Sequence, residues 1–153
     1  MGAQVALAAC ILFSFNAAAI TCGIIALIPV AIYPFAKRFT WWPQVFLGLA
    51  FNWGVLLAFI AHQGGLQVAA LILYLSGIFW TLFYDTIYAH QDIEDDALIG
   101  IKSTARLFGA KTWPWLLGFA LTSGGLMLGA LALQVQGPAF WVAGLGVAAF
   151  VLH

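Results

Sequence analysis

The sequence predicts an all-α fold, a polytopic bundle of about six transmembrane helices, from its composition and the pattern of its apolar runs. Hydrophobic residues make up 65% of the 153 residues, and only 7% are charged. A soluble domain has about 25% charged residues, so this chain has too few to cover a surface in water. Only helices and closed barrels satisfy every backbone group in a bilayer, and these runs lack the strict alternation of barrel strands. We therefore expect one membrane domain over residues 1–153.

Six helices follow from the lengths of the apolar runs. A bilayer core is crossed by about 20 residues. The uncharged run from Met1 to Ala36 would be about 54 Å long as one helix, which is too long for one crossing, so we divide it near Asn16. The predicted helices cover residues 2–15, 17–36, 43–61, 66–84, 113–135 and 138–152.

The ten charged residues gather in two regions that predict the orientation of the bundle. Lys37 and Arg38 form one pair, and the other eight lie between residues 85 and 111. Two predicted crossings separate the regions, so both face the same side of the membrane. The loops predicted on the other side, at 62–65 and 134–138, contain no Lys or Arg. Positive loops favour the cytoplasmic side, so we expect an integral, multi-pass protein with its charged loops facing the cytoplasm.

The charge balance also limits the partners. The chain has five basic and five acidic residues, whereas nucleic-acid binding needs a basic surface. We therefore expect the lipid bilayer as a partner and no nucleic acid. Cys10 and Cys22 lie in apolar runs without metal-like spacing, and we interpret them as packing residues.

The acidic segment that begins at Asp85 is the main candidate site. If the helix continues past Tyr84, then Asp85, Asp92 and Asp96 lie within about 20° of one line along it. Like charges on one helix face repel each other, so the pattern favours a bound cation. Mg²⁺ prefers oxygen ligands and combines one or two carboxylates with substrate phosphates. A solvated acidic loop is the alternative interpretation. On the same helix His90 would point away from the carboxylates, and we do not assign it as a catalytic base.

Four basic residues are candidates for phosphate binding, because Lys and Arg are the usual partners of phosphate oxygens. Lys102 and Arg106 follow the acidic segment, and Lys37 and Arg38 end an earlier predicted helix. The alternative is that they only anchor the protein at the membrane surface, as we expect for Lys111.

Two motifs resemble those of a known family. The first is DTIYA at 85–89, with aspartates at 92, 95 and 96 and IGIKSTA at 99–105; the second is YPFAKRFT at 33–40, followed by PQ at 43–44. Together they resemble the second aspartate-rich motif and a neighbouring loop of the UbiA-type intramembrane prenyltransferases. The likeness is greatest to the subgroup that prenylates 4-hydroxybenzoate in ubiquinone synthesis.

The resemblance implies a fold of about nine transmembrane helices around a central cavity. Two aspartate-rich motifs would face each other there and hold Mg²⁺ on an isoprenoid diphosphate. Asp85, Asp92 and Asp96 would be the metal-binding and catalytic residues of the second motif. The diphosphate would be bound by the basic residues Lys102, Lys37, Arg38 and Arg106. Tyr84 and Tyr88 would line the substrate pocket.

The implied reaction is transfer of a polyprenyl group from polyprenyl diphosphate to 4-hydroxybenzoate. A related enzyme with another aromatic acceptor, such as a naphthoate or homogentisate, is one alternative, and a cation-binding transporter subunit is another. The implied location is a bacterial inner membrane, or the mitochondrial inner membrane in a eukaryote.

The first aspartate-rich motif of the family is absent, because no acidic residue precedes Asp85. We therefore expect the chain to be the C-terminal part of such an enzyme, also without the last helix. It would be inactive alone and would need an N-terminal portion of the same enzyme as its partner.

Overall fold

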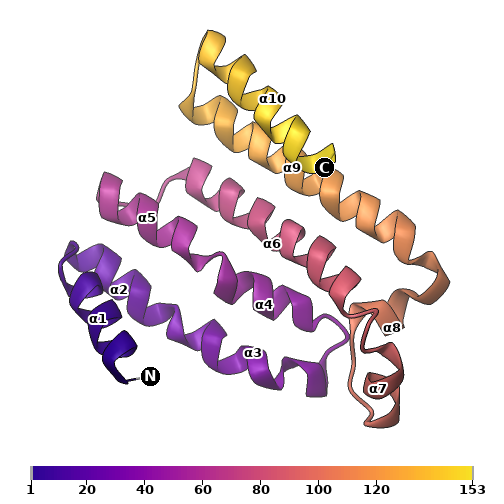
Figure 1. Ribbon diagram of the computed structural model, residues 1–153. Coiled ribbons are helices and arrows are strands. Elements are labelled where there is room, and N and C mark those ends of the chain that lie inside the picture. The colour runs from indigo at the N-terminus through magenta and orange to yellow at the C-terminus, as the bar shows by residue number, and fades with distance from the viewer. Residues whose placement is uncertain (1, 153) are drawn as a thin grey trace.

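The structure is a computed structural model that describes residues 2–152; Met1 and His153 lie outside the described residues. All regular secondary structure in this part of the chain is helical. The helices lie side by side and nearly in chain order, from α1 at one edge of the molecule to α10 at the other (Figure 1). The predicted all-α class is confirmed.

The N-terminal half contains three helical rods, as the lengths of the apolar runs predict. The first is one short helix, and each of the other two consists of two helices joined end to end. These helices are α1 (Gly2–Phe13), α2 (Ala17–Ile25), α3 (Leu27–Phe39), α4 (Pro43–Phe51) and α5 (Trp53–Gln63).

The C-terminal half contains the other three long helices and two short ones. The long helices are α6 (Val68–Tyr88), α9 (Thr112–Gln134) and α10 (Pro138–Leu152). Between α6 and α9 lie α7 (Ile93–Leu98), α8 (Thr104–Phe108) and a 3₁₀ turn at Gly109–Lys111. The sequence predicts the long helices, with α6 running four residues further than expected, but not α7 or α8.

Asn16 separates the first two rods and also links them to α5. Asparagine is a preferred residue before a helix because its side chain can accept a hydrogen bond from the first turn. Here Asn16 Oδ1 accepts from the Ala19 amide at 2.9 Å, and Nδ2 donates to the carbonyls of Ile60 and Ala61, each at 3.1 Å. The predicted division of the chain at Asn16 is confirmed.

Asn52 plays a similar part between α4 and α5. Its Nδ2 donates to the Gly48 carbonyl at 2.9 Å and to Thr81 Oγ1 of α6 at 3.0 Å. A Cβ atom at Gly77 would collide with the Asn52 side chain, so glycine is required where α6 passes this side chain. Asn52 thus ends one helix and fixes its distance from α6.

The tightest packing is between α6 and α9. Ser76 Oγ donates to the Ser123 carbonyl at 2.8 Å, and Ser123 Oγ donates to the Ser76 carbonyl at 3.0 Å. Small polar residues at such an interface let two helices approach closely in a bilayer. The core beside it includes Ile78, Leu82 and Phe119.

The outer surface of the rods is apolar. Four helical stretches are long and apolar enough to cross a membrane: Ala17–Phe39, Pro43–Gln63, Val68–Tyr88 and Thr104–Gln134. On α10, Trp141 and Leu145 are each 73% exposed. Large exposed apolar surfaces are rare on soluble monomers, and they mark protein- or membrane-contacting surfaces. The chain is therefore an integral membrane protein.

Candidate functional site

One end of the bundle collects most of the charged side chains. It is formed by the C-terminal ends of α3 and α6, the short helices α7 and α8, and the first turns of α4 and α9 (Figure 1). We call this the charged end. It carries the acidic segment on and after α6 and the basic residues of α3 and α8.

The expected common face of three carboxylates on one helix is wrong. Helix α6 ends at Tyr88, and α7 begins at Ile93 after a turn. In this turn the amides of His90 and Gln91 bond three residues back, to the carbonyls of Ile87 and Tyr88. Three acidic residues occupy the first turn of α7. Negative charge is favourable at a helix N-terminus, whereas it would repel itself along a continuous helix.

The three candidate aspartates lie in different surroundings. Asp85 is half-buried one turn before the end of α6, and Asp92 is exposed in the turn. Asp96 is only 5% exposed, and its Oδ2 has no hydrogen-bond partner among the described residues. Within residues 2–152, no three His, Cys, Asp or Glu side chains are grouped so that they could hold a metal ion. In the described part of the chain the three aspartates are therefore not brought together as one metal site.

The charge of Asp85 acts on two residues of α3, although α4 packs between α3 and α6. The side chains of Lys37 and Tyr33 both interact electrostatically with the Asp85 carboxylate. They are four residues apart and so project from one face of α3. Lys37 is among the candidate site residues expected from the sequence, but Tyr33 is not. The four-residue spacing, which places Tyr33 on the same helix face as Lys37, could have added Tyr33 to them.

Lys102 is held next to the end of α3. Its backbone amide donates to the Lys37 carbonyl at 3.1 Å, and its ammonium group donates to the Phe39 carbonyl at 3.5 Å. The ammonium nitrogen also lies 6.0 Å from the ring centroid of Trp41. The structure thus brings together Lys37 and Lys102, which are far apart in the sequence.

Arg106 braces the loop between α7 and α8. Its Nη1 donates to the carbonyl of Asp96 at 3.2 Å and to that of Ile101. Its guanidinium carbon lies 5.5 Å from the Trp41 ring centroid. Trp41 therefore contacts both Arg106 and Lys102, and cations over an indole ring are stabilised by its electron-rich face. The sequence does not predict this pairing.

The remaining predicted residues lie at the outer part of the charged end. Arg38 is exposed and sits over the Phe35 ring at 5.8 Å. Tyr84 and Tyr88 are one turn apart on α6, with their rings edge to face at 6.4 Å. Tyr84 is half-buried, whereas Tyr88 is 61% exposed.

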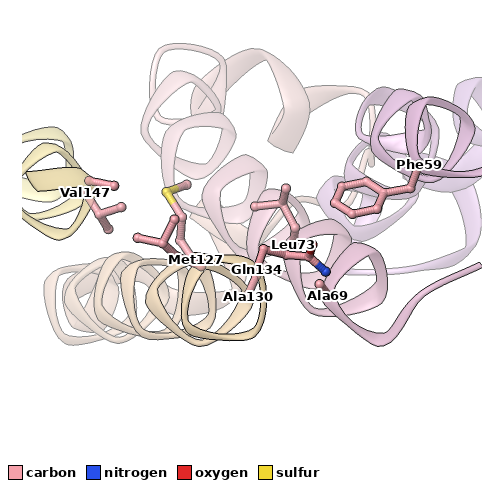
Figure 2. A pocket seen from close by; sticks show the side chains of 9 residues that line it. Phe59, Ala69, Leu73, Met127, Ala130, Gln134 and Val147 are labelled. Carbon is pink, nitrogen blue, oxygen red and sulfur yellow. The ribbon is translucent and has the colours of Figure 1, made fainter. Parts of the chain in front are cut away.

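An apolar pocket lies far from these residues. It has a volume of about 210 Å³ and opens between α5, α6, α9 and α10. Figure 2 shows Phe59 on one side and Val147 on the other, with Leu73 and Met127 between them. The pocket also touches Ala69, which precedes Asp85 by about 24 Å along α6. The pocket therefore belongs to the opposite end of the bundle.

Fold and site together define a multi-pass helical membrane protein with carboxylates and cations gathered at one mouth. Comparison with known proteins narrows this class. The chain belongs to the UbiA prenyltransferase family, whose family model matches residues 1–153.

The chain is also similar to curated proteins named "4-hydroxybenzoate polyprenyltransferase, mitochondrial". The protein from Rattus norvegicus is 52% identical over 134 residues, which are 87% of this chain and 35% of the relative. The protein from Homo sapiens is 50% identical over the same shares. The protein from Aedes aegypti is 44% identical over 155 residues, 100% of this chain and 35% of the relative. The chain therefore spans about a third of their length. No solved structure matches it significantly.

Proposed function

We propose that this chain takes part in the transfer of a polyprenyl group from polyprenyl diphosphate to 4-hydroxybenzoate in ubiquinone biosynthesis. The relatives named above support the substrates. One structural observation carries the assignment to the charged end. Asp85 lies at the mouth of an apolar bundle within electrostatic reach of Lys37, and the Lys37 carbonyl accepts a hydrogen bond from the Lys102 amide. Carboxylates beside two cations suit a metal-bound diphosphate.

The cationic side chains would bind the diphosphate itself. Lys37 at the end of α3 and Lys102 in the loop before α8 are joined by a backbone hydrogen bond, and Arg38 and Arg106 follow them in α3 and α8. Ionised donors make the strongest hydrogen bonds to phosphate oxygens. We propose that Lys37 and Lys102 make the main contacts, because Arg106 already uses Nη1 to hold two backbone carbonyls.

The carboxylates fit a magnesium ion that is shared with the diphosphate. All of the donors are hard oxygen atoms, and the buried Oδ2 of Asp96 has no partner within the described chain. Mg²⁺ is usually held by one or two carboxylates together with substrate phosphates, so a closed protein cage is not required. Asp85, Asp92 and Asp96 would contact the magnesium–diphosphate complex, one or two of them at the ion itself, and the bound ion would neutralise charge on the leaving diphosphate.

The chemistry breaks the bond between the allylic carbon and the diphosphate oxygen, and the electron pair leaves with the diphosphate. Lys37 and Lys102 would stabilise that negative charge, an electrostatic role that is often the largest in catalysis. The aromatic acceptor then forms a carbon–carbon bond with the allylic cation, and its ring proton passes to the departed diphosphate, which restores the aromatic ring. Tyr84 and Tyr88 would present aromatic faces to the cation, and apolar walls would exclude water.

We further propose that residues 1–153 are part of a single membrane domain, with the second aspartate-rich motif at 85–96. A facing motif would come from an N-terminal portion of the enzyme, since the relatives are about three times as long. The charged end would face the cytoplasm in a bacterial inner membrane, or the matrix in a mitochondrial one, because basic loops favour that side.

A chimeric enzyme tests this function. The matched segment of the Rattus norvegicus relative is replaced by this chain, and membranes are supplied with polyprenyl diphosphate, Mg²⁺ and 4-hydroxybenzoate. We expect prenylated 4-hydroxybenzoate, and none from membranes that contain this chain alone. An inactive chimera that is inserted in the membrane as well as its active parent would refute the proposal.

The same membranes test the alternatives. A naphthoate or homogentisate that is prenylated faster than 4-hydroxybenzoate would assign a different acceptor. A transporter would hold its cation near the middle of the bilayer, but Asp85 lies one turn from the end of α6. Mg²⁺ flux through vesicles without any transfer would nevertheless favour a transporter.

A further inference from the structure

His90 occupies the turn that separates Asp85 from Asp92. Its ring nitrogen Nδ1 lies 2.7 Å from the carbonyl oxygen of Thr86, and Nε2 lies 3.2 Å from Thr112 Oγ1. A carbonyl oxygen only accepts hydrogen bonds, so Nδ1 is the donor to Thr86. The ring therefore connects the last turn of α6 with the first residue of α9.

The bond to Thr86 explains why α6 ends here. In a continuing helix, the Thr86 carbonyl would accept from the backbone amide of His90, four residues later. That amide instead bonds the Ile87 carbonyl at 3.1 Å, which leaves the Thr86 carbonyl free. The His90 ring takes this place, as polar side chains near a helix C-terminus often do.

The partners of His90 are themselves fixed. Thr112 is buried, and its hydroxyl oxygen also lies 2.8 Å from the Gly109 carbonyl oxygen. With Nδ1 as the donor to Thr86, Nε2 is an acceptor, so the single hydroxyl proton of Thr112 is shared between Nε2 and the Gly109 carbonyl. Thr86 is fully buried, and its hydroxyl pairs with that of Thr104 in α8 at 2.7 Å. The ring of His90 thus joins a network that ties α6, α8 and α9 together around the acidic turn.

We propose that His90 is a positioning residue that ends α6 and fixes the turn at residues 89–92 against α9. It thereby sets the place of Asp92 and the start of α7 relative to Asp85. We call the link that the His90 ring makes between α6 and α9 the His90 latch. The consequence for catalysis rests on the proposed function, whereas the existence of this latch does not. Because both aspartates would share one metal–diphosphate complex, a loosened turn weakens metal binding more than binding of the aromatic acceptor.

Two variants and two controls test the bond between His90 and Thr112 in the chimeric full-length enzyme. His90→Asn keeps an amide nitrogen close to the position of Nδ1 but is too short to reach Thr112. Thr112→Val removes the hydroxyl and keeps the shape, and Thr112→Ser keeps the hydroxyl as a conservative control. Gln91→Ala is the matched control in the turn, because Gln91 is exposed.

Amide hydrogen exchange of residues 88–93 in lipid nanodiscs tests the latch directly. Loss of one hydrogen bond of ordinary strength speeds exchange about tenfold. We expect that acceleration in His90→Asn and in Thr112→Val, with exchange in the double variant no faster than in Thr112→Val, because the bond between His90 and Thr112 is lost in both. Thr112→Ser and Gln91→Ala should exchange like the parent. Unchanged exchange in His90→Asn, or additive effects in the double variant, would overturn the proposal.

Transfer assays on the same variants test the consequence. We expect the Mg²⁺ concentration for half-maximal rate to rise several-fold in His90→Asn and Thr112→Val, with the KM for 4-hydroxybenzoate unchanged. If the half-maximal Mg²⁺ concentration and the KM for 4-hydroxybenzoate change by the same factor, His90 does not position the metal-binding residues. If the parent chimera transfers no prenyl group, the proposed function fails, and the exchange data still decide whether the latch exists.

Discussion

Buried polar side chains in the middle of the bundle are paired across helices, whereas two at the charged end have an oxygen atom without a partner. Ser76 and Ser123 exchange hydrogen bonds between α6 and α9, and Asn52 donates to Thr81. At the charged end, Gln44 Oε1 and Asp96 Oδ2 are buried without any partner in the described chain.

The difference separates folding from function. A buried polar group without a partner costs stability, and proteins keep few of them. Paired groups in the middle hold helices together in a bilayer that offers no competing water. Unpaired groups at the charged end do not help the fold, and departures of this kind concentrate at functional sites. Substitutions in the two regions should therefore have opposite effects.

The largest effect is expected from Asp96→Asn. Its buried carboxylate would contact the metal–diphosphate complex, and loss of one such electrostatic contact costs about 100-fold in rate. The free energy of unfolding should stay the same or rise, because a neutral amide replaces a buried charge. Prenyl transfer and reversible unfolding in mixed micelles measure both. A strongly destabilised variant would show that Asp96 supports the fold instead.

Gly77→Ala should have the largest effect on stability. The added methyl group collides with Asn52, and overpacking of this kind costs about 1–3 kcal/mol. Gly118→Ala on α9 is the matched control, because nothing lies within 4 Å of a Cβ atom there. Unfolding in mixed micelles compares the two variants. Equal stabilities would mean that α4 and α6 are not in close contact at Asn52.

Ser123→Ala should have a smaller effect on stability and none on the rate per folded molecule. It removes the hydroxyl that donates to the Ser76 carbonyl, and such bonds between membrane helices contribute about 0.6 kcal/mol on average. Thr122→Ala, at the exposed neighbouring position, controls for the loss of a hydroxyl. A reduced rate with unchanged stability would contradict the division between the two regions.

Trp41→Leu should have the smallest effect. The indole ring contacts Lys102 and Arg106, and an exposed cation–π contact contributes about 0.5–1 kcal/mol. We expect the KM for polyprenyl diphosphate to rise about two- to fivefold, with little change in kcat. Trp113→Leu is the control, because Trp113 is 74% exposed. A fall in kcat alone would show that Trp41 does not position the cations for binding.

The sequence predicts the order of the long helices because most apolar runs have the length of one crossing, although the first and last helices are shorter than the four stretches able to span a membrane. It also predicts the break at Asn16, a residue whose side chain caps helices. Helices α7 and α8 have only six and five residues, which is too short for a clear period. They depend on contacts between distant segments, such as the bond from Lys102 to the Lys37 carbonyl.

The candidate site could be predicted only in part, for a similar reason. Its residue types, carboxylates beside lysines and arginines, are visible in the sequence, as is the position of Asp85 at the end of an apolar run. The relative placement of the carboxylates is not visible, because the helical phase does not continue through the turn. The end of α6 is set by His90, whose second partner, Thr112, comes 22 residues later.

The central claim is that the charged end handles the diphosphate, and a matched pair of isosteric substitutions tests it most directly. Asp85→Asn and Glu94→Gln each remove one negative charge, but Glu94 is exposed on α7. We measure Mg²⁺-dependent transfer from polyprenyl diphosphate to 4-hydroxybenzoate by the chimeric enzyme. The rate should fall by about the same factor as in Asp96→Asn, roughly 100-fold, in Asp85→Asn and stay near that of the parent in Glu94→Gln. Equal rates in the two variants would contradict the claim.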